Sequence, residues 1–333
     1  MNQKAIAQLL DVSISTVSLA LSDSPKVKAT TRERVKQLAQ TMHYQPSEIA
    51  RSLSSKRSMT IGIIFGQFMF PFYSERAEEI QKQLRKRHYL GLALTANTTE
   101  QIKETIETCI GRRVDGLIGS QFSPSDIALL KNAKLPYVLF DKSDPRGDYV
   151  CVDTAKGVFL ATEHLIKLGY REIGFLCAID PNHLRVEEFR ATMRRYNLPI
   201  HEEWIIPGSG YYTGGYSGMK KLLSLDNRPR AILAFNDVAA IGGMRAIREA
   251  GLKIPEDLAI VGFDDIEESE YACPPLTTMH QPKAEVAQKI VEILLNNIEN
   301  PDGREPQQLI LEPSLIIRGS CGFHCYRNKK EEV

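Results

Sequence analysis

From residue 60 onward, short β-rich apolar runs alternate with amphipathic stretches of helical spacing, and this alternation restricts the possible folds more than any other feature. Such alternation is typical of parallel sheets whose faces are covered by helices. It occurs in two series, over residues 60–140 and 149–263, which predicts two α/β lobes. The expected strands lie at 60–65, 90–95, 115–120, 137–140, 149–152, 172–176, 204–206, 231–235 and 258–263.

Helical patterns fill the intervals between these strands and continue beyond the last of them. The expected helices begin near residues 73, 99 and 124 and cover 154–168, 183–196, 214–224, 237–250 and 283–299. With strands near 307–318 they complete a predicted body at 60–320, with an N-lobe of about 60–152 plus 283–312 and a C-lobe of about 153–282 plus 313–320. The last residues, 321–333, are expected to form a tail.

The first 45 residues contain three helical patterns with short breaks and no strand pattern. Asn2 and Ser13 can cap the first two helices, and Thr30 or Thr31 can open the third. Two short helices joined by a tight turn form a helix-turn-helix pattern, so residues 1–45 are predicted to be a small all-α head. Residues 46–59 are expected to form a further short helix and a polar linker.

Charge is distributed unevenly between the head and the rest of the chain. Residues 1–60 hold nine Lys and Arg against four Asp and Glu, a net charge of +5, whereas the remainder holds 33 against 37, a net charge of −4. A basic head on a mildly acidic body suggests that the head meets a polyanion. The alternative is a basic face that is merely solvated.

Composition excludes several classes of protein. Apolar residues make up 43% and charged residues 25%, as in ordinary soluble globular proteins. We find no apolar run near the ~18 residues that a membrane span needs, and no signal-peptide pattern at the N-terminus. The six cysteines are mostly far apart, which is expected of reduced thiols. A cytoplasmic protein that contacts no membrane is therefore expected.

Several motifs resemble one family of proteins, and they follow one another in order along nearly the whole chain. They include Val12–Leu21 and Tyr44-Gln45-Pro46 near the N-terminus, and Val261–Asp265 and Pro274–Thr278 in the body. These motifs resemble the LacI/GalR family of bacterial transcription regulators. The resemblance implies a helix-turn-helix head joined to a two-lobe, periplasmic-binding-protein-like body.

For the head, the resemblance implies that the second helix enters the major groove of DNA. The hydroxyls of Ser15, Thr16 and Ser18 stand at its start, where they can meet phosphates and base edges or simply cap the helix. The family's base-contacting positions match Ile14, Ser15 and Leu19, and an apolar Leu19 can pack on a thymine methyl. The remaining expected DNA contacts are Lys4, Arg32, Tyr44, Arg51 and Leu53.

The segment 47–54 resembles the family's hinge helix, which forms when two subunits sit on DNA. Leu53 matches the leucine that wedges into the minor groove there, where an inserted apolar side chain kinks the duplex. The alternative is that Leu53 packs on its own head.

For the body, the resemblance implies a small-molecule effector bound at the C-terminal ends of the strands, in the cleft between the lobes. Carboxylates and an amide at such strand ends suit the hydroxyls of a sugar. The alternatives are a satisfied turn at Asp264 and an exposed helix charge at Arg185. The positions that match effector contacts are Phe72, Tyr73, Asp141, Arg185, Asn236, Asp264 and Gln281.

These features together predict an effector-controlled DNA-binding regulator, a repressor that acts as a homodimer on near-palindromic operator DNA. A solute-binding protein without DNA function is the alternative, and it leaves the basic head unexplained. A two-domain α/β enzyme would need a catalytic constellation, which we do not find. No cofactor is expected, and Cys321, His324 and Cys325 form only a weak metal-ligand pattern, so no metal site is expected.

Overall fold

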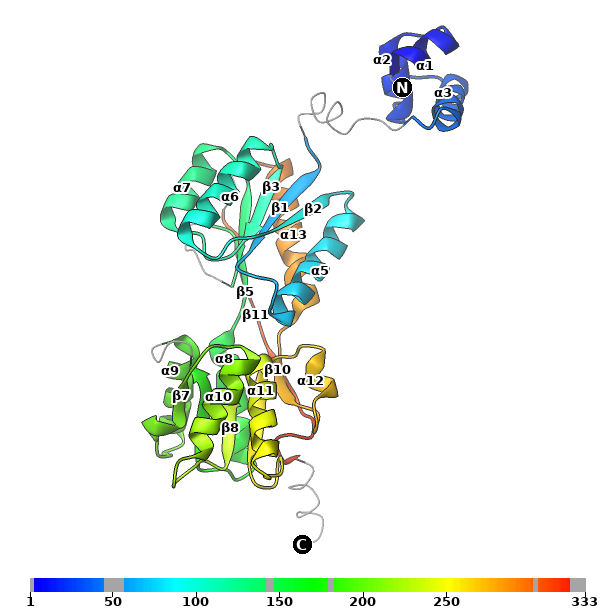
Figure 1. Cartoon of the computed structure of the whole chain (residues 1–333). Coiled ribbons are helices and arrows are strands. Elements are labelled where there is room, and N and C mark those ends of the chain that lie inside the picture. The colour runs from blue at the N-terminus through cyan, green and yellow to red at the C-terminus, as the bar shows by residue number, and fades with distance from the viewer. Residues whose placement is uncertain (1–2, 45–56, 142–146, 179–182, 302–304, 324–333) are drawn as a thin grey trace. The chain divides into compact units, whose positions relative to one another are not determined.

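The computed structural model describes residues 3–44, 57–141, 147–178, 183–301 and 305–323. It divides into two compact units, Met1–Met59 and Thr60–Val333. The first unit contains the head and the second contains the body (Figure 1). No single helix in the described ranges is long and apolar enough to cross a membrane, although one sharply bent pair, Gln3–Leu10 with Ile14–Leu21, passes that test by length and composition.

The head consists of helices α1 (Gln3–Leu10), α2 (Ile14–Leu21) and α3 (Ala29–Thr41). Ser13 caps α2, because its side chain accepts a hydrogen bond of 3.0 Å from the backbone N–H of Thr16. The three helices share one small core, formed by Ile6, Ala7, Val17, Ala20, Val27, Val35 and Ala39. The predicted helical head is confirmed; α3 begins one residue before Thr30, and the predicted cap Asn2 lies outside the described residues.

The N-lobe is built on a parallel six-stranded sheet of order β11-β5-β4-β3-β1-β2. Helices α5 (Pro71–Lys86) and α13 (Lys283–Glu299) lie side by side on one face, and α6 (Thr99–Gly111) and α7 (Pro124–Asn132) cover the other (Figure 1). Its strands are β1 Thr60–Phe65, β2 Leu90–Thr95, β3 Gly116–Gly119, β4 Tyr137–Phe140, β5 Tyr149–Val152 and β11 Gln308–Leu311. Strands covered on both faces need nearly continuous apolar sequence, which TIGIIF and YVLF provide.

The C-lobe has the same design on a second six-stranded sheet of order β12-β10-β9-β8-β6-β7, in which only β12 is antiparallel to its neighbour. Its strands are β6 Ile173–Ala178, β7 Ile205–Pro207, β8 Ala231–Ala234, β9 Ala259–Asp264, β10 Thr277–His280 and β12 Ser314–Ile316. Its helices are α8 Thr154–Lys167, α9 Leu184–Arg195, α10 Tyr212–Leu223, α11 Asp237–Glu249 and the short α12 Glu268–Tyr271, with a 3-10 turn at Glu202–Trp204. The predicted two-lobe α/β body is confirmed.

Three chain segments connect the two sheets. They run from β5 into α8, from β10 into α13, and from β11 into β12. The first and third are tied together, because the N–H of Asp153 donates to the carbonyl of Leu311 over 2.9 Å. The C-terminal ends of the parallel strands of both sheets therefore lie near the junction of the lobes.

The last described residues of the chain pack into the C-lobe. Cys321 is fully buried in the C-lobe core, with its Sγ 3.3 Å from Nε2 of His164. The chain is held there because the hydroxyl of Ser320 donates to the carbonyl of Ile260 and accepts from the N–H of Thr277. These bonds fasten Ser320 to the sheet, next to the buried Cys321.

Candidate DNA-binding and ligand-binding sites

Helix α2 presents a mixed polar and apolar surface. Val17 and Ala20 are buried in the head core, whereas Ser15 and Ser18 are exposed on the opposite side. Ile14 and Leu19 are also exposed, at 49% and 37% of their full surface, although both are large apolar side chains. Hydroxyls beside exposed aliphatic groups can contact phosphates, base edges and thymine methyls.

Hydrogen bonds within the head organise part of this surface. The hydroxyl of Ser13 lies 2.7 Å from that of Ser15 and 2.8 Å from that of half-buried Thr16. Lys4 is exposed, whereas Arg32 is held by the carbonyl of Ser24 at 3.4 Å. These contacts leave Lys4 more available to a phosphate than Arg32.

Of the other residues predicted to contact DNA, two are less accessible and two lie outside the described residues. Arg32 also pairs with Asp23, whose carboxylate lies 3.6 Å from Nε. Tyr44 is half-buried and packs against the head core. Arg51 and Leu53 lie outside the described residues, so their assignments stay predictions.

On the N-lobe side of the junction, a buried arginine pairs with one of the predicted ligand contacts. The side chain of Arg76, on α5, is fully buried, and its Nη1 donates to the carboxylate of Asp141 at the end of β4. The Arg76 guanidinium lies 4.4 Å from the ring centre of Phe72 and 5.6 Å from that of Phe140. Asp141 is held in a left-handed backbone conformation, with φ 56°. The predicted contacts Phe72 and Asp141 are thus joined through Arg76.

Arg76 was missed by the sequence analysis. Among the residues that the structure describes, its Nε and Nη2 atoms have no hydrogen-bond partner. A buried donor without a partner costs roughly 1–3 kcal/mol, so this guanidinium retains capacity to donate to a ligand oxygen. The one sequence signal for a place of Arg76 in the ligand site is its position four residues after Phe72, on the same helix face.

On the C-lobe side, three predicted contacts from three different segments come together. Asp264 ends β9, and its Oδ1 accepts a hydrogen bond of 2.7 Å from Nε2 of Gln281. The same oxygen lies 3.9 Å from Nη2 of Arg185, near the start of α9. Arg185 also donates to the carbonyl of Phe235 over 2.5 Å and stacks 4.0 Å from the ring centre of Phe263. Arg185 is therefore a junction residue and not an exposed helix charge.

Asn236 has a structural task at the same junction. Its side-chain oxygen accepts a hydrogen bond of 2.8 Å from the N–H of Ala239 and caps α11. The residue is only 7% exposed. The amide oxygen is thus used by the helix, and the side-chain NH2 is the group that could donate to a ligand.

Tyr73 shows that the two sides face one another. Burial raises the pKa of its phenol to about 12, and the negative charge of Asp141 adds to the effect. Asp264, from the other lobe, also raises this pKa, while Arg76 and Arg185 lower it. Tyr73 also packs against a cluster formed by Phe72 of its own lobe and by Val238 and Ile266 of the C-lobe, so it lies at the junction.

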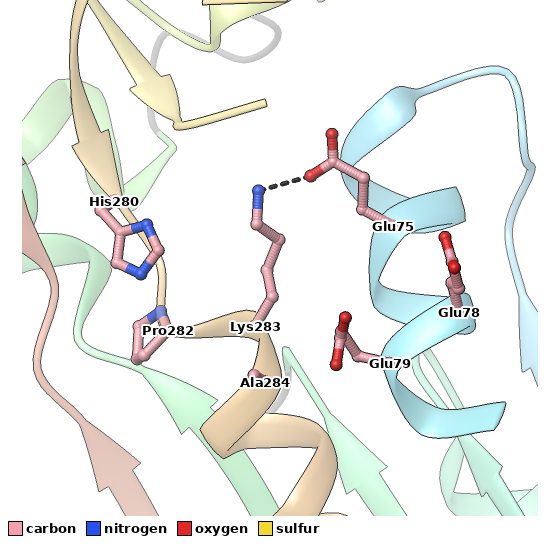
Figure 2. Close-up of a pocket in the computed structure, with 7 residues that line it drawn as sticks. All are labelled: Glu75, Glu78, Glu79, His280, Pro282, Lys283 and Ala284. Atoms are coloured by element: carbon pink, nitrogen blue, oxygen red, sulfur yellow. Dashed lines mark hydrogen bonds and ion pairs between the residues drawn. The ribbon is translucent and has the colours of Figure 1, made fainter. Parts of the chain in front are cut away.

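Further contacts close the junction around this polar centre. Tyr211, before α10, stacks on Phe70 with ring centres 4.5 Å apart and donates to Oε1 of Gln67 over 2.6 Å. Lys283, at the start of α13, forms an ion pair of 2.5 Å with Glu75 of α5 (Figure 2). Within the described ranges, no group of three or more His, Cys, Asp and Glu side chains could hold a metal ion.

The buried carboxyl of Asp264 makes stability depend on pH. Burial raises its pKa from 3.8 to about 7, although Arg185, Gln281 and Lys283 favour the charged form. Because the folded pKa is the higher one, the stabilisation from this group is complete below about pH 4 and is lost as the pH rises through about 7. We expect the unfolding free energy of the wild type, relative to Asp264→Asn, to fall by on the order of 2 kcal/mol between about pH 5 and about pH 8. Urea denaturation of both proteins measures this, and a difference independent of pH would contradict it.

Comparisons with known proteins agree with this architecture. Residues 4–47 match a model described as bacterial regulatory proteins, lacI family, and residues 162–321 match a periplasmic binding protein-like domain. The ribose operon repressor of Haemophilus influenzae is 34% identical over 328 residues, which cover 95% of this chain and 97% of that protein. The transcriptional repressor PurR of Actinobacillus pleuropneumoniae is 33% identical over 326 residues, with coverage of 95% and 97%.

Two solved structures extend the comparison. The lac repressor dimer bound to operator and the anti-inducer ONPF is 26% identical, with a TM-score of 0.86 over 96% of this chain and 99% of that one. A LacI family regulator from Enterococcus faecium with bound ribose is 32% identical, with a TM-score of 0.71 over 78% of this chain and 98% of that one. The matched head, the two-lobe body and relatives that align over nearly their full length lead to one conclusion. This chain belongs to the LacI family of bacterial transcription regulators.

Proposed function

We propose that this protein is a repressor whose affinity for operator DNA is set by a small, uncharged polyhydroxyl ligand, most simply a sugar, bound between its lobes. The observation that carries the proposal is the polar centre at the lobe junction of a chain with a helix-turn-helix head. There Arg76 and Asp141 of one lobe face Arg185 and Asp264 of the other around Tyr73.

The chemistry of this centre favours a sugar over an anion or a cation. Each arginine has a carboxyl partner, and the raised pKa of Asp264, about 7, leaves that partner partly ionised near neutral pH, so the centre carries little net charge. A hydroxyl both donates and accepts, and adjacent hydroxyls can therefore donate to an aspartate while they accept from an arginine. The rings of Phe72 and Tyr73 can pack against the apolar face of a sugar ring. The ribose-bound relative from Enterococcus faecium supports this ligand class.

The DNA side of the proposal rests on the exposed face of α2. We propose that Ile14, Ser15 and Leu19 contact base edges, and that Thr16, Ser18 and Lys4 contact the backbone. Arg32, Tyr44, Arg51 and Leu53 remain proposed contacts of the same interface. The likeness to the lac repressor dimer on operator supports a homodimer on a near-palindromic site in the cytoplasm.

A ligand screen followed by an operator titration tests this function. Sugars, sugar acids and nucleobases are first ranked by the shift that each causes in the thermal unfolding of the full chain. A ligand at 100 times its dissociation constant should stabilise the protein by about 2.7 kcal/mol. The stabilising compound should be an uncharged sugar, and it should change the affinity for an operator selected from random duplexes. Stabilisation by nucleobases or sugar acids alone would contradict the proposed ligand class.

A further inference from the structure

One lysine joins three segments of the protein at the lobe junction. Lys283 is the first residue of α13, and its Nζ donates to Oε2 of Glu75 over 2.5 Å (Figure 2). The same ammonium donates to the backbone carbonyl of Asp265 over 2.5 Å and lies 3.3 Å from that of Asp264. All three acceptors therefore share one charged donor.

Glu75 completes a bridge between the lobes. It lies on α5 of the N-lobe, and its Oε1 accepts a hydrogen bond of 3.0 Å from the N–H of Glu267 in the C-lobe. The side chains of Lys283 and Glu75 are only 12% and 28% exposed. An ion pair with so little solvent around it is screened less than an exposed pair. Glu75 is thus linked to the C-lobe directly through Oε1, and through Oε2 by way of Lys283, which itself bonds the C-lobe carbonyls of Asp264 and Asp265.

Other charges near Lys283 have partners of their own. Glu79, on the same face of α5, pairs with Lys82 over 2.7 Å, and Glu78 lies 3.5 Å from the same ammonium. The side chain of Asp265 is held at 2.8 Å by Arg318 and at 2.8 Å by His280. Glu75 is therefore the carboxylate that Lys283 engages.

The carbonyls that Lys283 binds belong to a strained turn. Asp264 has φ 120° and Asp265 has φ 52°, so two consecutive residues with side chains adopt a left-handed conformation. Such backbone costs on the order of a few kcal/mol and persists only where its surroundings enforce it. Lys283 enforces it on one side, and Asp264 presents its carboxyl to Arg185 and Gln281 on the other.

We propose that Lys283 and Glu75 form a lobe latch that couples ligand binding at Asp264 to the position of helix α5, and thereby to operator affinity. This proposal rests on the proposed function and assigns a regulatory route to its ligand site. A ligand that shifts the side chain of Asp264 also shifts the carbonyls of the Asp264–Asp265 turn. Lys283 bonds these carbonyls and Glu75 at the same time, so a shift of the carbonyls displaces its ammonium from Glu75. The Lys283–Glu75 ion pair is therefore formed in one arrangement of the lobes and broken in the other.

Four variants of the full chain test the lobe latch. Lys283→Met removes the charge but keeps a long side chain, and Glu75→Gln removes the charge but keeps an oxygen for the N–H of Glu267. The double variant measures whether the two residues act together. Lys82→Met is the matched control, because it removes a lysine–glutamate pair within α5 that does not span the lobes.

Two measurements are made on each variant without ligand. Hydrogen exchange of residues 265–269 reports whether the latch ties the C-lobe segment to α5, and we expect it to speed up at least about tenfold in Lys283→Met and to stay unchanged in Lys82→Met. Titration of an operator duplex, selected by the wild type from random DNA, reports the coupling. We expect both single variants to change operator affinity by at least about fivefold in the same direction, and the double variant to match Lys283→Met.

The outcomes separate the lobe latch from the proposed function. Faster exchange in Lys283→Met with operator affinities within about twofold of the wild type in both single variants would overturn the coupling, while the proposed function would stand. Multiplicative effects in the double variant would also overturn it, because the residues would then act separately. A wild type that selects no operator would instead refute the proposed function. If Lys283→Met does not fold, Glu75→Gln against Lys82→Met gives the same comparison.

Discussion

Replacing Asp264 or Arg185 by alanine is expected to abolish the change in operator affinity that the ligand causes in the wild type. Asp264 ends β9 and Arg185 is the second residue of α9, and the structure brings their charged groups to 3.9 Å in a nearly solvent-free site. Removing one partner leaves the other charge, or the ligand's hydroxyls, unpaired there, which costs about 2–5 kcal/mol. The ligand affinity should therefore fall by roughly 30-fold to several thousand-fold.

Calorimetry with the identified ligand, together with an operator titration, measures both halves of this expectation. Asp264→Asn is a useful companion variant, because asparagine tolerates the left-handed backbone that alanine disfavours. Arg194→Ala is the matched control, since it removes an exposed arginine from the same helix. If either junction variant binds the ligand as the wild type does, that residue has no role in recognition, and the site must be built around Asp141 and Arg76.

Asp237→Ala is expected to cause the largest loss of stability, about 3 kcal/mol or more in the free energy of unfolding. The Asp237 carboxylate is fully buried and accepts hydrogen bonds from the N–H of Ile266 (3.0 Å) and the hydroxyls of Ser269 (2.8 Å) and Thr278 (2.5 Å). Alanine would leave all three donors buried without this acceptor. The carboxylate is packed directly against the backbone of Gly262, where a Cβ would lie only 2.0 Å from its Oδ1.

Urea denaturation of Asp237→Ala gives this loss directly, and Asp226→Ala, at an exposed position of the same lobe, serves as the control. A loss below about 1 kcal/mol would mean that the three donors find other partners. The N-cap of α11 is the preceding residue, Asn236, so Asp237 is not needed for capping. Asp237 instead ties α11 to β10 and to the segment before α12.

The parts of the fold that depend on local pattern were predictable. β1 and β2 lie at the predicted residues 60–65 and 90–95, and α13 covers the predicted 283–299, because short apolar runs mark strands and helical spacing marks packed helices. Helix α5 begins two residues earlier than expected, at Pro71, since proline fits the first turn of a helix.

Elements that depend on distant partners were not predictable. Strand β10 contains one aliphatic residue, Met279, and its threonines are buried only because their hydroxyls find partners. Thr278 donates to Asp237, and Thr277 accepts from the N–H of Arg318 over 2.9 Å. These partners lie about 40 residues away in sequence, beyond the reach of any local pattern.

The candidate ligand site likewise contains residues that were predictable from the sequence and one that was not. Arg185, Asp264 and Gln281 were predicted from the family resemblance, and the structure brings them together. Arg76 was missed because it stands among charged residues of α5, a pattern typical of a solvent-exposed helix face. Its burial requires Phe140, which belongs to a strand 64 residues further along the chain.

The most direct test of the whole account is an operator titration with the full chain and with the fragment 60–333 over a series of salt concentrations. Contacts from the head to phosphates release counterions, so the affinity of the full chain should fall steeply with salt, by roughly a thousandfold or more between about 50 and 200 mM for six or more phosphate contacts. The fragment should form the folded body and bind the sugar ligand, yet show no preference for operator over random DNA. A fragment that binds the operator as tightly as the full chain would contradict the account, because the head would then not be the part that recognises DNA.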